Sequence, residues 1–108
     1  MTVRAVVKGV GHYLPERIVP NAEFETFLDT TDDWIQSRSG IKNRHFAAEG
    51  ETTSDLATHA ANAALADAGL QGSDIDAIVL ATSTADLTFP SSATKVQHAI
   101  GNTNGYAF

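Results

Sequence analysis

Residues 53–82 read TSDLATHAANAALADAGLQGSDIDAIVLAT, and this stretch decides the fold class. Its first half predicts a helix, because polar side chains recur at the spacing of one helix face while alanine and leucine fill the other positions. The polar residues are Asp55, Thr58, His59 and Asn62. Gly69 is the expected end of this helix, since glycine readily adopts the left-handed backbone of a C-cap.

The second half of the stretch predicts a buried strand. Residues 77–82 form a continuous apolar run after a polar turn at residues 72–74. Such a run is typical of a parallel strand that is covered on both faces. The many alanines of the preceding helix allow other backbones to approach it closely, so we expect this helix to be largely buried in a layered fold.

Shorter patterns on both sides extend the alternation of helices and strands. The further predicted elements are a strand over residues 3–10, a short helix capped by Asn21, a second short helix over residues 34–38 that Gly40 ends, an irregular or edge-strand segment over residues 40–48, a helix from Pro90 to Ile100, and a strand that begins at residue 105. This order predicts an α/β fold with right-handed crossovers.

The composition is that of a globular domain with an excess of acidic groups. The chain has 108 residues, 43% of them hydrophobic, and a formal net charge of −6, which opposes nucleic acid or an anionic membrane as a partner. Arg38, Lys42 and Arg44 form a local cationic cluster, so a small anionic ligand remains possible. No cysteine is present, which excludes disulfides and a thiol nucleophile within these residues. No apolar run approaches the roughly 18 residues of a membrane span, so we expect a cytoplasmic protein.

Trp34 and Arg38 are the first candidate site, because two side chains four residues apart lie on one face of a helix. An aromatic plane beside a planar cation suits a nucleotide, since the indole can stack on a base and the guanidinium can bind phosphate. The alternative is structural: Trp34 is a core residue, and Arg38 is a solvent-exposed cation paired with Asp32 or Asp33. Spacing alone does not decide between these interpretations.

The segment around this pair closely resembles a signature of the β-ketoacyl-acyl-carrier-protein synthase III family of thiolase-like condensing enzymes. The resemblance rests on residues 29–35 (DTTDDWI), 38–41 (RSGI) and 44–45 (RH), and it continues at residues 9–15 (GVGHYLP), 81–84 (ATST) and 89–93 (FPSSA). Two departures are Ser39, where threonine is frequent in the family, and Asn43, where a charged residue is common.

The resemblance implies both an architecture and a ligand. Residues 1–108 would be the N-terminal part of the first half-domain of a layered αβαβα fold, with an incomplete sheet. Trp34 would stack on the adenine of coenzyme A, Arg38 would contact the nucleotide, and Thr30 would lie nearby.

Phe89 is a second candidate, since it directly precedes the helix start at Pro90. The resemblance implies that Phe89 lies near the acyl pocket of the neighbouring subunit in a homodimer. The alternative is a core phenylalanine that packs against the N-terminus of the helix. The histidines lack the spacing of a metal site, so we nominate none of them and predict no metal or cofactor.

The reaction implied by the resemblance is a decarboxylative Claisen condensation of an acyl-CoA, with acetyl-CoA as the expected primer, with malonyl-acyl carrier protein, which initiates fatty-acid synthesis. The family's catalytic cysteine, histidine and asparagine lie beyond the matched region. We therefore expect residues 1–108, which stop inside a predicted strand, to be a fragment that is inactive alone. Two alternatives remain: a coenzyme A-binding module without chemistry of its own, and a related thiolase-like acyltransferase.

Overall fold

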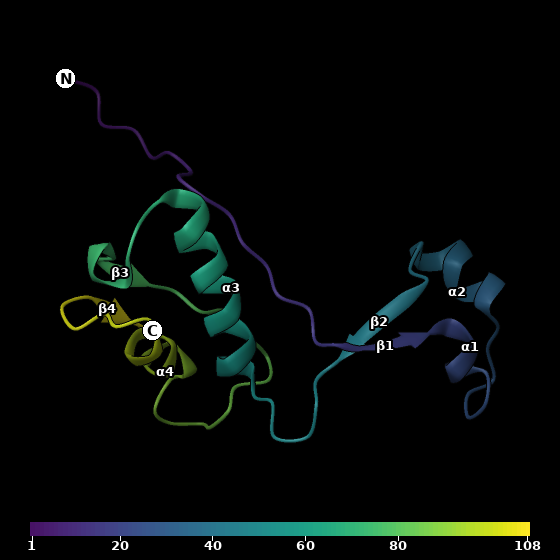
Figure 1. The fold of residues 1–108 in the computed structure, drawn as a ribbon. Coiled ribbons are helices and arrows are strands. Elements are labelled where there is room, and N and C mark those ends of the chain that lie inside the picture. Colours follow the sequence, from purple (N-terminus) through teal and green to yellow (C-terminus); the bar gives the residue numbers. More distant parts are fainter. The chain divides into compact units, whose positions relative to one another are not determined.

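The computed structural model describes residues 1–108, which form two compact units. We call Leu14–Gly50 the small unit, and Met1–Tyr13 with Glu51–Phe108 the large unit. The elements in chain order are β1 (Arg17–Pro20), α1 (Asn21–Phe24), α2 (Asp32–Ser39), β2 (Asn43–Phe46), α3 (Thr53–Ala68), the 3-10 turn η1 (Gly72–Asp74), β3 (Ala77–Ile78), α4 (Ser92–Ala99) and β4 (Tyr106–Ala107) (Figure 1).

The small unit pairs two strands with two short helices. β1 and β2 are antiparallel, with Val19 opposite Arg44, and Val19 is buried. The helix α2 begins as expected from its cap residues: the Thr31 hydroxyl oxygen accepts a hydrogen bond from the backbone N–H of Trp34. It ends at Gly40, whose φ of 70° is the left-handed conformation predicted for that position.

The large unit is built from α3, α4 and a parallel strand pair. Thr52 caps α3 in a reciprocal capping box with Asp55, and Gly69 ends the helix with a φ of 67°. β3 and β4 are parallel, with Ala77 opposite Tyr106, and α4 lies between them in the sequence. This helix–strand–helix–strand order confirms the predicted α/β class.

Gly9 and Gly11 allow the N-terminal segment to lie directly on α3. A Cβ atom at Gly11 would lie 2.3 Å from the backbone nitrogen of Ala64, and one at Gly9 would lie 2.7 Å from the Ala64 carbonyl oxygen. Neither distance is compatible with a side chain. The predicted close approach of a backbone to the alanine-rich helix is therefore confirmed.

The strand predicted over residues 3–10 was wrong, because these residues pair with no other strand. Valine at four positions has strand propensity, but that propensity is realised only when a neighbouring strand supplies hydrogen bonds and packing. The exposed fraction of Val3 is 93%. The run over residues 77–82 is likewise a strand only at Ala77–Ile78, although the backbone N–H of Leu80 still donates to the Phe108 carbonyl at 3.0 Å.

Two further expectations about helices were wrong. α3 is not largely buried, since Ser54 is its one buried residue. Asn21 does not cap α1 but is its first residue, with Pro20 at the N-cap position, and its side chain is used elsewhere. That side chain is 1% exposed and makes tertiary hydrogen bonds described below.

Asn102 holds the strand end of the large unit together. Its amide nitrogen donates to the carbonyls of Gly72 at 2.8 Å and Ile75 at 2.5 Å. Its amide oxygen accepts from Gln97 at 3.0 Å and from the backbone N–H of Gly105 at 2.8 Å. One buried side chain thus satisfies four polar groups from three segments.

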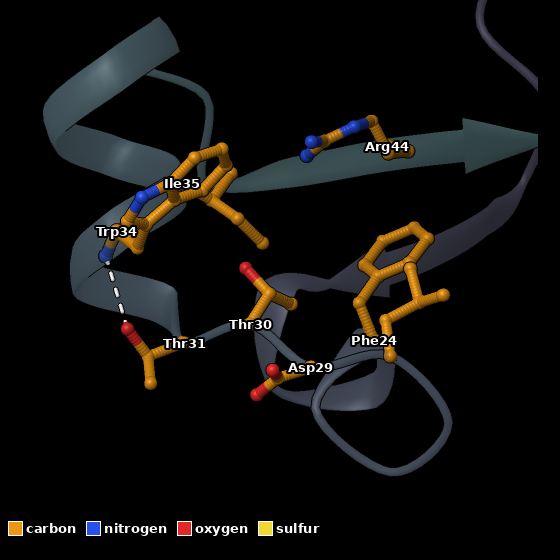
Figure 2. A pocket seen from close by; sticks show the side chains of 8 residues that line it. Phe24, Asp29, Thr30, Thr31, Trp34, Ile35 and Arg44 are labelled. Atoms are coloured by element: carbon orange, nitrogen blue, oxygen red, sulfur yellow. Dashed lines mark hydrogen bonds between the residues drawn. The ribbon is translucent and has the colours of Figure 1, made fainter.

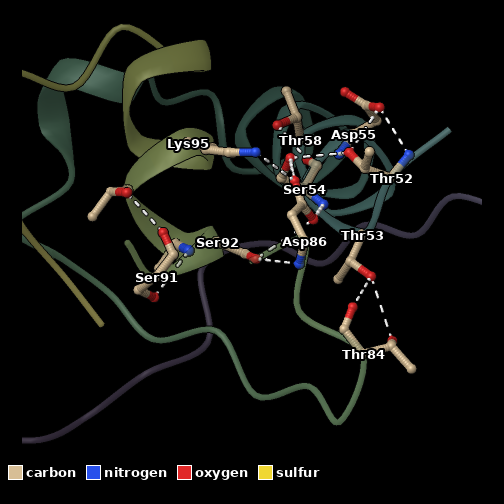
Figure 3. A network of polar contacts seen from close by, with 12 residues as sticks. Thr52, Thr53, Ser54, Asp55, Thr58, Thr84, Asp86, Ser91, Ser92 and Lys95 are labelled. Atoms are coloured by element: carbon tan, nitrogen blue, oxygen red, sulfur yellow. Dashed lines mark hydrogen bonds and ion pairs between the residues drawn. The ribbon is translucent and has the colours of Figure 1, made fainter. Parts of the chain in front are cut away.

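Asp86 ties the N-termini of α3 and α4 together (Figure 3). Its carboxylate accepts hydrogen bonds from the backbone N–H of Ser54 at 2.9 Å and from the Ser54 hydroxyl at 2.6 Å, and it pairs with Lys95 at 3.1 Å. The Ser92 hydroxyl accepts from the Asp86 backbone N–H at 3.0 Å. These contacts, led by the Ser54 hydroxyl, hold the pKa of Asp86 well below its usual value. The side chain of Asp86 is 3% exposed, so the carboxylate is an interior connector of the two helices.

Candidate functional site

An open pocket of about 700 Å³ lies in the small unit (Figure 2). Helices α1 and α2, the loop between them and strand β2 supply its walls. The lining residues are Phe24, Leu28, Asp29, Thr30, Thr31, Trp34, Ile35 and Arg44. The pocket thus combines an apolar surface, an indole, hydroxyl groups and a cation, which is a combination that suits a ligand with both a ring and a charged group.

Trp34 faces this pocket and is not a core residue. Its exposed fraction is 57%, so the structural alternative for Trp34 was wrong for this chain. The Arg38 guanidinium lies 5.7 Å from the centroid of the Trp34 ring, which is a cation–π contact across one turn of α2. The predicted proximity of these two side chains is confirmed.

Asp32, which the structural alternative offered as an ion-pair partner of Arg38, is engaged elsewhere. Its carboxylate accepts hydrogen bonds from the amides of Asn21 at 2.8 Å and Gln36 at 2.8 Å. These two hydrogen bonds lower the pKa of Asp32, and the bond from Asn21 has the larger effect. The Arg38 charge is therefore not neutralised by Asp32.

The structure brings two of the three predicted ligand residues to the pocket wall. Thr30 and Trp34 line the pocket, whereas Arg38 is not among the lining residues. The hydroxyl oxygen of Thr30 is buried and has no hydrogen-bond partner within the chain. Such a group ordinarily finds a partner, so it is a candidate to bond with whatever covers this wall.

The cation that lines the pocket is Arg44, which the sequence placed in a cationic cluster and in the 44–45 part of the resemblance, without a role in the site. Its guanidinium lies 5.3 Å from the centroid of the Phe24 ring, and Nη1 donates to Asn21 Oδ1 at 2.9 Å. Phe24 was not among the predicted site residues. The segment over residues 40–48 was expected to be irregular or an edge strand, and β2 places Arg44 beside the pocket helices through its pairing opposite Val19 on β1, a strand that was not predicted.

Comparison with known proteins gives one consistent answer. No protein-family model matches the chain. The β-ketoacyl-[acyl-carrier-protein] synthase III of Ruegeria pomeroyi is 79% identical over all 108 residues. The crystal structure of 3-oxoacyl-[acyl-carrier-protein] synthase III from Aquifex aeolicus is 44% identical and superposes on 93% of this chain with a TM-score of 0.87. The corresponding Thermus thermophilus enzyme is 42% identical over 96% of this chain, with a TM-score of 0.86.

Over its whole length the chain is similar to part of the β-ketoacyl-acyl-carrier-protein synthase III proteins. It spans 33% of the length of the Ruegeria relative and 32% of the Aquifex structure. Its fold is accordingly a partial thiolase-like condensing-enzyme fold, with two small incomplete sheets in place of a full layered one. The recognition made from the Trp34 segment is confirmed.

Phe89, for which the resemblance to synthase III implies a role near the acyl pocket of a partner subunit, lies on the loop before α4. Its exposed fraction is 86%, so the alternative of a core phenylalanine packed on the helix was wrong for this chain. The loop is held by Asp86 and by a hydrogen bond from the Thr53 hydroxyl to the Thr84 carbonyl at 2.5 Å (Figure 3). The role of Phe89 stays a prediction.

No cluster of three or more histidine, cysteine or acidic side chains in this chain could hold a metal ion. His45 Nδ1 lies 2.7 Å from the carbonyl oxygen of Pro15, and His59 stacks with Tyr13 at a centroid distance of 4.5 Å. None of the helices is both long enough and apolar enough to cross a membrane.

Proposed function

We propose that residues 1–108 supply part of the acyl-CoA site of a β-ketoacyl-acyl-carrier-protein synthase III. The observation that carries this proposal is the pocket that presents the exposed Trp34 indole beside Thr30 and a cation. In this proposal Trp34 stacks on the adenine of coenzyme A, and Arg38, packed against the same indole, contacts the nucleotide. The unpartnered hydroxyl of Thr30 supplies a hydrogen bond in the same wall.

The reaction proposed for the full-length protein is the condensation of an acyl-CoA, with acetyl-CoA as primer, with malonyl-acyl carrier protein. A cysteine thiolate attacks the thioester carbonyl and displaces coenzyme A, forming an acyl-enzyme. The malonyl group then loses carbon dioxide, and the resulting carbanion attacks the acyl-enzyme carbonyl and releases the thiolate. Residues 1–108 contain no cysteine, so in this scheme they bind substrate and do not react with it. We expect them to be inactive alone.

The proposal extends to a homodimer and a cytoplasmic location. The exposed Phe89 would lie near the acyl pocket of the partner subunit. In the full-length homodimer, each subunit is therefore expected to contribute its Phe89 to the acyl pocket of the other subunit.

Substitution of Trp34 in the full-length protein tests the coenzyme A role. Loss of a stacking ring costs about 1 to 3 kcal/mol of binding, so Trp34→Ala should raise the KM for acetyl-CoA about tenfold while kcat changes little. Trp34→Phe is the matched control and should recover most of the affinity. The proposal fails if Trp34→Ala leaves the KM for acetyl-CoA at its original value.

A coenzyme A-binding module without chemistry is the second candidate, because every residue that lines the pocket belongs to the small unit. The chain contains one tryptophan, so indole fluorescence of the 108-residue chain reports on Trp34 alone. A saturable change on addition of coenzyme A would support this candidate, and no change with soluble chain would count against it. A related acyltransferase is the third possibility, and turnover by the full-length protein with malonyl-acyl carrier protein would separate it from synthase III.

A further inference from the structure

Arg44 is a pocket cation to which the resemblance assigns no role. We infer that Arg44 binds a phosphate group of the ligand that occupies the Trp34 pocket. This inference rests on the proposed function, because it adds a residue to the same site.

The position of Arg44 is the first argument. The side chain extends from β2 over the Phe24 ring towards Ile35 and Trp34, and it lines the pocket that they share (Figure 2). Arg38 lies against the Trp34 ring and is absent from that lining. A ligand ring that stacks on Trp34 inside the pocket would therefore bring its charged substituents within reach of Arg44.

Asn21 fixes the Arg44 guanidinium in advance of binding. Asn21 is 1% exposed, and its amide nitrogen donates to Asp32 at 2.8 Å and to the Ile41 carbonyl at 2.7 Å. These two bonds turn the amide oxygen towards Arg44, which donates to it at 2.9 Å. A guanidinium held in this way loses little conformational freedom when a ligand binds.

The charge of Arg44 remains available for an anion. Its hydrogen-bond partner is the neutral amide of Asn21, and no carboxylate of the small unit forms an ion pair with it. An arginine presents five N–H donors in a planar fork, a geometry that matches two oxygens of one phosphate. Asp29 also lines the pocket, but Figure 2 shows it at the opposite side from Arg44, so an anion would be favoured at the Arg44 side.

The test uses the full-length protein and two ligands that differ in charge. Calorimetric titration with adenosine 3′,5′-bisphosphate measures binding of the phosphorylated nucleotide, and kcat/KM with acetyl-pantetheine measures use of a substrate without phosphate. Arg44→Gln should weaken bisphosphate binding about tenfold, since it removes a charge-assisted bond, and should make binding less dependent on salt. Its kcat/KM with acetyl-pantetheine should be unchanged. Arg44→Lys keeps the charge but loses the planar fork of donors, so its affinity for the bisphosphate should lie between that of the original protein and that of Arg44→Gln.

Lys42→Gln is the matched control, because Lys42 is an exposed cation two residues away that does not line the pocket. It should change bisphosphate binding by less than about twofold. Unchanged binding in Arg44→Gln, with weaker binding in Trp34→Ala, would overturn the inference and leave the proposed function intact. Unchanged bisphosphate binding in both Arg44→Gln and Trp34→Ala would overturn both the inference and the proposed function. An equal loss with acetyl-pantetheine would show that Arg44 only supports the pocket wall, which also overturns the inference.

Discussion

Each unit contains one buried asparagine that makes hydrogen bonds through both ends of its amide, and the two sets of partners differ. Asn102 in the large unit bonds three backbone groups and the neutral side chain of Gln97. Asn21 in the small unit bonds one backbone carbonyl and two charged side chains, Asp32 and Arg44. The first arrangement closes a corner of the fold, whereas the second orients charged groups beside an open pocket. A buried amide therefore closes the fold in one unit and holds charged side chains beside the pocket of the proposed ligand site in the other.

The largest expected effect is on the stability of the large unit. Asn102→Ala would leave the Gly72 and Ile75 carbonyls and the Gly105 N–H without their partner, so it should lower the free energy of unfolding by about 3 kcal/mol. Urea unfolding of the full-length protein measures this loss. Asn104→Ala, an exposed asparagine of the same loop, should cost less than about 0.5 kcal/mol. Equal losses in the two variants would contradict the role assigned to Asn102.

A smaller effect, and one that depends on pH, is expected at Asp86. Asp86→Asn keeps the shape of the side chain but replaces one acceptor oxygen by an NH₂ group, which cannot accept from Ser54 or Lys95. The pKa of Asp86 is lower in the folded chain than the usual value of about 3.9. Its stabilising contribution is therefore complete above about pH 4 and is lost as the pH falls through the depressed pKa.

The original protein should accordingly have a higher Tm than Asp86→Asn near neutral pH, and this difference should shrink as the pH falls below about 4. Asp76→Asn, at an exposed aspartate of the same unit, is the matched control and should show no such narrowing. A difference in Tm between the original protein and Asp86→Asn that stays constant down to pH 2 would contradict the role assigned to the ionised carboxylate.

The parts of the fold that could be predicted from the sequence are those that local preferences decide, and the parts that could not depend on pairing between distant residues. Helices α2 and α3 begin and end at Thr31, Gly40, Thr52 and Gly69, where local side-chain and backbone preferences decide the outcome. β1 was missed, because Arg17–Pro20 has no alternating pattern and its pairing with β2 joins residues far apart in the sequence. The strand predicted over residues 3–10 was wrong for the opposite reason: its valines have strand propensity but no partner strand covers them, and they are exposed.

The candidate site divides in a similar way. Trp34 and Arg38 were predicted to meet because both lie on one short helix, and the helical spacing is sufficient to bring them together. Arg44 reaches the pocket only through the β1–β2 register and the Asn21 amide, and neither can be read from the spacing of nearby residues. Sequence reasoning therefore found the part of the site made by one helix and missed the part made by tertiary pairing.

The smallest expected effect compares the helix caps of the two units. Thr31→Ala and Thr52→Ala each remove a hydroxyl that accepts from the first turn of a helix, so each should lower the free energy of unfolding by about 1 kcal/mol. Only Thr31 belongs to the pocket lining, and the helix that it caps carries Trp34. Thr31→Ala should therefore also weaken coenzyme A binding in a calorimetric titration, while Thr52→Ala, with the same loss of stability, should not. If the two variants weaken binding equally, general stability rather than the local order of α2 governs the pocket, and the functional distinction between the units fails.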